Sequence, residues 1–352
     1  MGRCPGRFLQ AQILAGMNRA RPAFAPAEAK GSPLPQKLII DADPGIGDAL
    51  AIALALFDPE IDLIGLTATA GCVTARTATR NVQAVVETLD PAKWPRLGGL
   101  MSDTPVEAPP LDPAGDIVLK INGPGGLGDL DVQVADLHNI RDPARVLSEL
   151  VKAAPNEITL LTLGPLTNVE RACDRNSDFL PSLKRLICLG GAVDGGGDVT
   201  PSAELNIYCD PEAARNVLRM PATKSMIPLE IARGAVLTVD QIHKLCDDES
   251  RRGKFLKNML TYGFRAYHEH LGREGFPIRE VVALCAVSRP ELFESRRLAV
   301  DVEISGELTR GMTVADRRMT TPVHRLNMEV PVRVSEAGVL DYFHKTFELL
   351  VG

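Results

Sequence analysis

The chain has 352 residues, a formal net charge of −6 and an apolar fraction of 45%, of which little is aromatic. This composition predicts a large aliphatic core in one α/β unit. The acidic balance disfavours nucleic acid and anionic membranes as partners, and no apolar run is long enough to span a membrane, so we expect a soluble protein. The cysteines are scattered without a CxxC pair, which is typical of reduced thiols in a cytoplasmic protein.

The first 36 residues differ from the rest of the chain. They are rich in arginine, contain a single acidic residue, Glu28, and end in a stretch rich in Pro, Ala, Gly and Ser. The apolar run at residues 8–17 is interrupted by Gln10 and Gln12, which disfavours a signal peptide. We therefore predict a flexible N-terminal extension over residues 1–36 and one folded domain over residues 37–352.

Residues 37–57, KLIIDADPGIGDALAIALALF, contain the motif around which the predicted fold is organised. A short apolar run ends in Asp41 and Asp43, a Pro-Gly turn follows, and Asp48 precedes an alanine- and leucine-rich run. This pattern predicts a strand, a loop and a helix. Asp48 lies at the predicted start of the helix, where free N–H groups and the helix dipole favour a carboxylate. Asp43 and Asp48 should then meet at the carboxyl end of a strand, where open α/β sheets bind ligands.

Several acidic oxygens at such a point, with no Cys or His nearby, indicate a hard cation such as Ca²⁺ or Mg²⁺. The alternative is a strand-end turn followed by a helix cap, without a metal. One Asp would fit that alternative, whereas three within eight residues favour the cation site.

Strand-like and helical patterns alternate along the rest of the chain. Apolar runs predict strands at residues 61–69, 158–163, 186–189, 224–229, 300–304 and 326–334. Periodic patterns predict helices at residues 74–89, 144–154, 166–173, 212–218, 239–271, 280–288 and 337–350. This alternation predicts an α/β fold with a mostly parallel central sheet, helices on both faces and a Rossmann-like core.

Two further motifs are weaker signals. Residues 123–128, GPGGLG, match GxGxxG, but Pro124 lacks an N–H group for a phosphate. We interpret this stretch as a mobile loop over a site. His268 and His270 fall on alternate faces of a predicted helix, which disfavours joint binding of a metal.

A candidate binding segment lies at residues 203–206, between a glycine-rich loop and a predicted helix. In an extended segment, Glu204 and Asn206 project to the same side. Their carboxylate and amide groups suit the vicinal hydroxyls of a sugar. The alternative is a role in capping or in tying the loop, and this stretch alone does not separate the two.

Four motifs in order resemble those of the inosine–uridine-preferring nucleoside hydrolase family. DADPGIGDALAI resembles its N-terminal DxDPGxDD signature, and ITLLTLGPLTN, LGGAVDGGGDVTPSAELNIYCDPEAA and LTRGMTVADRR resemble its later motifs. The resemblance covers residues 37–350. It implies an α/β fold, a small-molecule riboside as substrate, and hydrolysis of a ribose–base bond through an oxocarbenium-like state.

The resemblance also implies a Ca²⁺ ion at the strand ends. Its implied ligands are Asp43, Asp48, the backbone carbonyl of Leu163 and Glu280. The ion would hold the ribose hydroxyls and the attacking water, and would lower the pKa of that water. Glu204 and Asn206 match the ribose-binding pair of the family. Family members are commonly dimers or tetramers, which implies a homodimer or homotetramer.

The chain departs from the family pattern at positions that carry chemistry. Gly47 stands where the family has a second Asp, which the resemblance identifies as the general base, and Arg279-Glu280 replaces a late His-Asp pair. Arg279 cannot donate a proton near neutral pH, but it could stabilise negative charge on a leaving group. Glu280 is one methylene longer than Asp and could still bind Ca²⁺.

Other departures fall on the sugar-binding positions. Cys72 and Asp198 each replace an Asn, and Asn122 stands where a pocket-loop His is common. Asp41 and Asp198 are the candidates for a relocated base, and Asp198 is preferred because Asp41 is expected to be tied to backbone behind the metal. Two hypotheses follow: a Ca²⁺-dependent N-ribosyl hydrolase with Asp198 and Arg279 as catalytic residues, or a catalytically impaired riboside-binding or regulatory protein.

Overall fold

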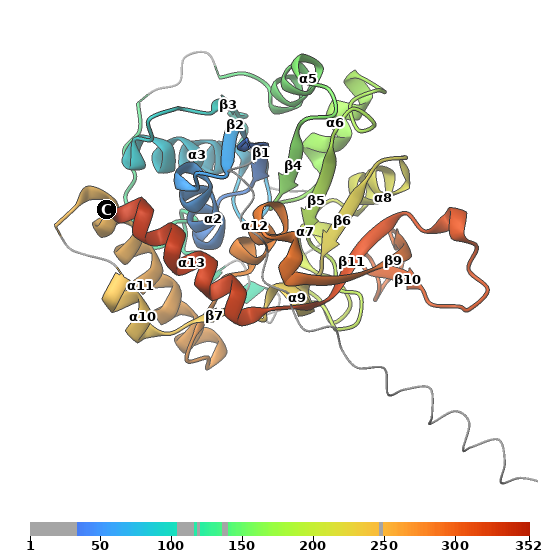
Figure 1. Cartoon of the computed structure of the whole chain (residues 1–352). Helices are drawn as coiled ribbons and strands as arrows, with labels where there is room; N and C mark the ends of the chain where they lie inside the picture. Colours follow the sequence, from blue (N-terminus) through green and yellow to red (C-terminus); the bar gives the residue numbers. More distant parts are fainter. Residues whose placement is uncertain (1–33, 104–115, 118–119, 136–139, 246–248) are drawn as a thin grey trace, which may run out of the picture. The chain divides into compact units, whose positions relative to one another are not determined.

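The structure is a computed structural model that describes residues 34–103, 116–117, 120–135, 140–245 and 249–352 (Figure 1). Residues Pro35–Gly352 form one compact unit. Nearly all of the predicted N-terminal extension therefore lies outside the described residues.

A sheet of nine strands runs through the described part of the chain, in the order β10-β9-β11-β6-β5-β4-β1-β2-β3. The strands are β1 (Gln36–Ala42), β2 (Ile61–Ala68), β3 (Arg96–Gly98), β4 (Thr159–Thr162), β5 (Arg185–Leu189), β6 (Lys224–Ile227), β9 (Phe293–Val302), β10 (Thr313–Asp316) and β11 (Met328–Val334). Pairing is parallel from β11 through to β3 and antiparallel at the β9 and β10 edge. The mostly parallel sheet predicted from the sequence is confirmed.

Helices cover both faces of this sheet (Figure 1). On one face lie α2 (Ile46–Phe57), α3 (Ala75–Leu89), α11 (Arg251–Leu271), α12 (Arg279–Ser288) and α13 (Glu336–Val351). On the other lie α5 (Pro143–Ala153), α6 (Thr167–Arg175) and α8 (Pro211–Arg219). Side chains of β1 alternate between the two cores, since Leu38 and Ile40 join the first and Ile39 joins the second.

Shorter elements lie among these helices. They are α7 (Leu205–Cys209), α9 (Leu229–Ala232), α10 (Val239–Leu245), the strand pair β7 (Val236–Leu237) and β8 (Phe276–Pro277), and the 3₁₀ turns η1 (Pro290–Leu292) and η2 (Val323–Arg325). Helix α12 is buried from Glu280 to Ser288 and packs on α2, β4 and β5. An all-round buried helix of this kind belongs to the centre of a core.

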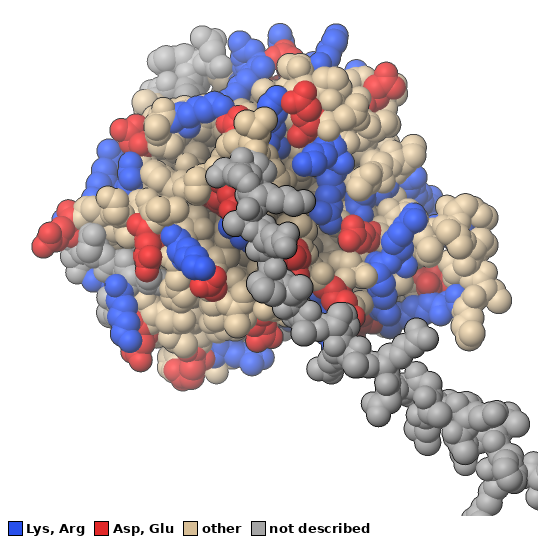
Figure 2. All heavy atoms as spheres, viewed as in Figure 1, with Lys and Arg blue, Asp and Glu red and all other residues tan. Residues whose placement is uncertain are grey.

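The face drawn in Figure 2 carries acidic and basic side chains interspersed with one another. Among the described residues, no helix combines the length and the apolar character needed to cross a bilayer. Cys72, Cys173, Cys188, Cys209 and Cys285 are all free thiols. Burial raises the pKa of Cys188 to about 12, so this thiol stays protonated and packs as a small apolar side chain.

Candidate active site

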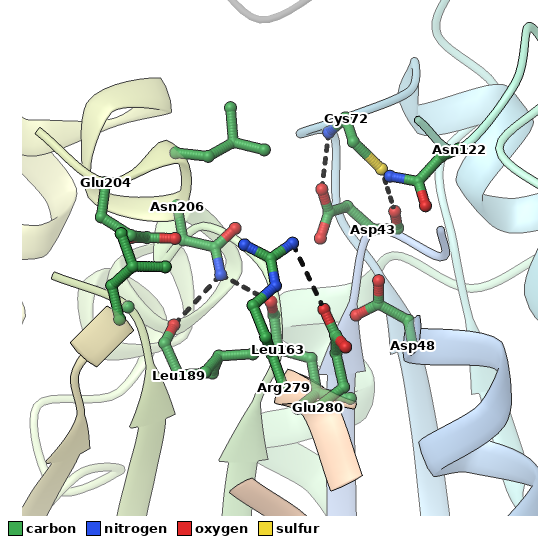
Figure 3. A pocket seen from close by; sticks show the side chains of 13 residues that line it. Asp43, Asp48, Cys72, Asn122, Leu163, Leu189, Glu204, Asn206, Arg279 and Glu280 are labelled. Carbon is green, nitrogen blue, oxygen red and sulfur yellow. Dashed lines mark hydrogen bonds and ion pairs between the residues drawn. The ribbon is translucent and has the colours of Figure 1, made fainter. Parts of the chain in front are cut away.

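A pocket lies at the carboxyl ends of the parallel strands, between the first turns of α2 and α12 (Figure 3). It is lined by Asp43, Asp48, Cys72, Asn122, Leu163, Leu189, Gly190, Glu204, Leu205, Asn206, Leu229, Arg279 and Glu280. These include every metal ligand and sugar contact predicted from the sequence except Asp198, which lines a neighbouring cavity. Residues far apart in the chain are thus brought to one place by the parallel sheet.

Asp43 follows β1 directly and is 3% exposed. Its Oδ2 accepts a hydrogen bond from the backbone N–H of Cys72 at 2.6 Å, and the Cys72 thiol donates to the Asp43 carbonyl at 2.9 Å. Burial raises the pKa of Asp43 to about 6, and the Glu280 carboxylate adds to the rise. Cys72 is therefore a backbone partner of Asp43 as well as a lining residue.

Asp48 lies in the first turn of α2, where its Oδ2 accepts a hydrogen bond from the Gly45 N–H at 3.0 Å. Its other oxygen, Oδ1, is buried and has no hydrogen-bond partner. Burial raises the pKa of Asp48 well above its ordinary value, and the negative charges of Asp43 and Glu280 raise it further. A buried carboxylate oxygen without a partner is costly unless a ligand satisfies it.

Three carboxylates thus face one pocket, from Asp43, Asp48 and Glu280 (Figure 3). Their oxygens have the chemistry that a hard cation prefers, and the partnerless oxygen of Asp48 fits such a group. As they stand, no three His, Cys, Asp or Glu side chains within the described ranges form a ready metal-binding group. The donor set therefore fits a cation in chemistry, while its side chains are not closed around a common point.

These pKa shifts predict that the metal-free protein becomes less stable as the pH rises from about 5 to 8. Burial raises the pKa of Asp43 from 3.8 to about 6 and that of Glu204 from 4.5 to about 8. Below their unfolded-state pKa values, both carboxyl groups are protonated in the folded and in the unfolded protein. Above those values the unfolded protein loses these protons first, which favours unfolding until the pH passes the folded-state pKa values. Thermal melts in EDTA across this range test this, and a melting temperature that rises with pH would contradict it.

Arg279, at the start of α12, faces both cavities. Its Nη1 lies 3.1 Å from Asp198 Oδ2 and its Nη2 lies 3.7 Å from Glu280 Oε1. Burial alone would lower the pKa of Arg279, but the neighbouring Tyr267, Glu280 and Asp198 raise it above its ordinary value. The guanidinium therefore remains charged and cannot act as a proton donor.

The predicted base Asp198 lines the neighbouring cavity and is not among the residues that line the carboxylate pocket. Its side chain is 4% exposed, its Oδ2 pairs with Arg279, and its Oδ1 accepts a hydrogen bond from the Leu205 N–H at 3.0 Å. Both oxygens are thus occupied by protein groups, which disfavours a base at this position. The geometry instead makes Asp198 the partner that orients Arg279.

Asp41, the other candidate base, is fully buried and does not line the pocket. Its Oδ1 accepts hydrogen bonds from the Thr67 hydroxyl and the Asn168 amide, and its Oδ2 has no partner. The expectation that backbone groups hold Asp41 was therefore wrong, since side chains of β2 and α6 hold it.

Glu204 has an extended backbone and immediately precedes the short helix α7, whereas Asn206 lies within that helix, so the extended segment considered for both residues ends at Glu204. Glu204 caps α7, accepting hydrogen bonds from the N–H groups of Ile207 and Gly191. The Asn206 amide donates to the carbonyls of Leu163 at 2.6 Å and Leu189 at 3.1 Å. Both side chains also line the pocket. The capping and loop-tying contacts are therefore present, and sugar binding by the same two side chains stays a prediction.

The glycine-rich stretch at residues 123–128 lies against α2 and α3. Asn122 Oδ1 accepts a hydrogen bond from the Ile46 N–H at 3.0 Å, and so caps α2. The amide of the buried Asn81 donates to the carbonyls of Pro44 and Gly125. These bonds hold the stretch beside the loop that carries Asp43, so it is a structural support for the pocket.

Replacing Gly126 with alanine should lower the melting temperature by about 3 °C, because Gly126 has a φ of +83° and a left-handed residue with a Cβ costs about 1–2 kcal/mol. The new Cβ would also lie 2.8 Å from Asn81 Nδ2 and from the Pro44 carbonyl. The neighbouring Gly125→Ala is the matched control, since nothing lies within 4 Å of its added Cβ. Equal melting temperatures for the two variants would contradict this account.

Sequence reasoning missed two glycines that make room for Asp43. A Cβ at Gly164 would lie 2.5 Å from Asp43 Oδ1, and one at Gly71 would lie even closer to Asp43 Oδ2. The sequence signal was present, because each glycine follows shortly after a strand that neighbours β1. Both positions keep the two oxygens of Asp43 unobstructed.

The neighbouring cavity has a volume of about 670 Å³ and shares Arg279 with the carboxylate pocket. Its other lining residues are Ile117, Ile121, Gly197, Asp198, Arg233, Val236, Thr238, Tyr267, Leu271, Arg273, Glu274, Gly275 and Pro277. It therefore offers an apolar and partly cationic space next to the acidic one. A ligand with a polar sugar and a planar base could place one part in each.

The chain matches the model of the family described as inosine-uridine preferring nucleoside hydrolase over residues 38–341. It is 33% identical to "Uridine nucleosidase 1" of Arabidopsis thaliana over 323 residues, which cover 87% of this chain and 91% of that protein. It is also 33% identical to "Non-specific ribonucleoside hydrolase RihC" of Shigella boydii over 280 residues, which cover 79% of this chain and 88% of the other.

Solved structures give the same result. A "Purine-Preferring Ribonucleoside Hydrolase from Gardnerella vaginalis" superposes with a TM-score of 0.79 at 27% identity, covering 90% of this chain and 99% of the other. The "Plant nucleoside hydrolase - PpNRh1 enzyme" superposes with a TM-score of 0.78 at 28% identity, covering 89% and 99%. From its motifs, its fold and these similarities, the chain belongs to the inosine-uridine preferring nucleoside hydrolase family.

Proposed function

We propose that this protein hydrolyses the N-glycosidic bond of a nucleoside or a related riboside and releases free base and ribose. The observation that carries the proposal is the cluster of Asp43, Asp48 and Glu280 at the end of β1, with a partnerless oxygen on Asp48. The names of the related hydrolases and the family membership support the same reaction.

Members of the family use a metal ion, and we propose that here it is Ca²⁺. Asp43, Asp48, Glu280 and the backbone carbonyl of Leu163 would hold it, since all are oxygen donors that line the pocket. A Ca²⁺ ion held there would coordinate the ribose hydroxyls and lower the pKa of a nearby water. The Leu163 carbonyl already accepts a hydrogen bond from Asn206, so the sugar-binding and ion-binding residues support one another.

We assign the role of general base to Asp43. Its carboxylate lines the acidic pocket together with those of Asp48 and Glu280, where the attacking water would lie. Asp198 is less suitable because Arg279 and the Leu205 N–H occupy its oxygens. The Asp43 carboxylate would accept a proton from the water that attacks the anomeric carbon of the sugar.

The leaving base is assigned to the second cavity, beside Arg279. A charged guanidinium stabilises a base that departs with negative charge, although it cannot protonate it. The sugar is assigned to the acidic pocket, where Glu204, Asn206, Cys72 and Asn122 lie. We also propose that the protein is cytoplasmic and forms a homodimer or homotetramer.

The direct test is incubation of the purified protein with a panel of purine and pyrimidine nucleosides, with ribose release as the readout. We expect release in the presence of Ca²⁺ and its loss in EDTA, with recovery when Ca²⁺ is added back. Full activity in EDTA would refute the need for a cation. If no ribose is released from any nucleoside, with Ca²⁺ or with EDTA, the proposed reaction is refuted.

A second candidate, a riboside-binding protein without turnover, is favoured by one observation. Gly47 carries no carboxylate at a signature position, and the raised pKa of Arg279 keeps its guanidinium from releasing a proton. This candidate predicts that ribosides raise the melting temperature and are recovered intact. Consumption of the riboside in the same sample would exclude it.

A further inference from the structure

Gly47, in the first turn of α2, is a buried glycine without an obvious backbone reason. Its φ lies outside the left-handed range, and glycine inside a helix is less stable than alanine. The atoms nearest to a Cβ built at this position all belong to the Glu280 carboxyl group. Oε1 would lie 2.9 Å away, and Cδ and Oε2 would lie closer still.

The Glu280 carboxylate thus lies in the space where a side chain at position 47 would begin. It arrives from α12, which packs on α2, and its side chain is 10% exposed. The extra methylene of Glu relative to Asp carries the carboxylate toward α2. In Figure 3 it lies beside the carboxylate of Asp48, the next residue after Gly47.

We propose that Gly47 and Glu280 are a size-complementary pair, in which a carboxylate carried by α12 occupies the position that a carboxylate carried by α2 would otherwise fill. The glycine at this signature position then makes room for the longer side chain of Glu280. That the Glu280 carboxylate binds a cation beside the hydroxyls of a riboside rests on the proposed function. The pairing itself rests on the contact between the two residues.

Gly47→Asp alone should not fit, because its Cβ would meet the Glu280 carboxylate. The Glu280 carboxylate lies at the end of a flexible side chain, so the variant can fold with that carboxylate displaced from Asp43 and Asp48. The expected defect is therefore weaker binding of the cation, with the fold retained.

The test compares the natural chain, Gly47→Asp, Glu280→Asp and the double variant by calorimetric titration with Ca²⁺. Each single change should weaken Ca²⁺ binding about tenfold or more. Gly47→Asp displaces the Glu280 carboxylate, and Glu280→Asp shortens the side chain that carries it. The double variant, with the longer side chain shortened and a carboxylate returned to α2, should bind within about threefold of the natural chain. Effects that simply multiply in the double variant would overturn the proposal.

A metal-free measurement separates this proposal from the proposed function. In EDTA, Gly47→Ala should lower the melting temperature of the natural chain, but raise that of Glu280→Ala by about 2 °C because the space is then empty and alanine favours the helix. The same sign in both backgrounds would overturn the pairing. If the natural chain binds no Ca²⁺, the proposal of a Ca²⁺ site is refuted. The opposite effects of Gly47→Ala in the two backgrounds then test the Gly47–Glu280 pairing by themselves.

Gly263→Ala is the matched control for simple overpacking. Gly263 lies in α11, and its added Cβ would meet the Phe276 ring at 2.8 Å, outside the carboxylate cluster. This variant should lower the melting temperature and leave the affinity for Ca²⁺ unchanged. A loss of affinity equal to that of Gly47→Asp would show that the effect of position 47 is general loosening, against the proposal.

Discussion

The Asp43→Asn variant should hydrolyse nucleosides about 10²–10⁴-fold more slowly than the natural chain at neutral pH. Asparagine has nearly the same shape, and its side-chain carbonyl can still accept the hydrogen bond from the Cys72 N–H. The variant should therefore keep the loop after β1 while lacking the carboxylate that accepts the proton. Rates measured at saturating Ca²⁺ separate this loss from weaker binding of the cation.

The pH profile and a second variant locate the base. kcat/KM of the natural chain should fall at acid pH with a midpoint below about 6, because burial raises the pKa of Asp43 to about 6 and a bound cation would lower it again. Asp198→Asn should lose less activity than Asp43→Asn. The opposite order would return the role of base to Asp198.

The Arg279→Gln variant should slow the hydrolysis of natural nucleosides by about 10²–10³-fold, the usual cost of removing one group that stabilises developing negative charge. It should change the hydrolysis of 4-nitrophenyl riboside much less, because nitrophenolate departs as a stable anion without help. Comparing kcat for the two kinds of substrate is the measurement. Equal losses on both would contradict a role for Arg279 at the leaving group.

The same variant should also be less stable. The ion pair between Arg279 and Asp198 is almost fully buried, with side chains 16% and 4% exposed, and leaving one partner of such a pair alone costs about 3–5 kcal/mol. We expect the melting temperature to fall by roughly 5 °C or more. Arg233→Gln is the matched control, because Arg233 lies 3.8 Å from the same carboxylate but is 48% exposed. It should change the melting temperature far less.

The fold could be predicted closely because its signals are local. Asp43 and Asp48 sit at a strand end and a helix start that apolar periodicity alone identified, and α13 matched its predicted range within one residue at each end. The predicted strand at residues 300–304 was too short and began late. The true strand β9 starts at Phe293, and its first half is exposed and rich in charged residues, so no apolar pattern marks it.

The site was predicted less completely because its contacts join distant segments. Sequence reasoning named Arg279 and Asp198 separately, but their ion pair joins residues 81 positions apart. The space between Gly47 and Glu280 likewise depends on how α12 packs on α2. The order of residues in the chain does not reveal such packing. The glycine at position 47 therefore looks like the loss of a carboxylate, although the Glu280 carboxylate occupies the space.

We propose that water cleaves a ribose–base bond in the pocket around Asp43. The most direct measurement is incubation of a nucleoside with the Ca²⁺-loaded protein in ¹⁸O-labelled water and phosphate buffer, followed by mass spectrometry of the products. The account predicts equal amounts of free base and ribose, with one ¹⁸O atom in the sugar. Intact nucleoside, or ribose 1-phosphate in place of labelled ribose, would contradict it.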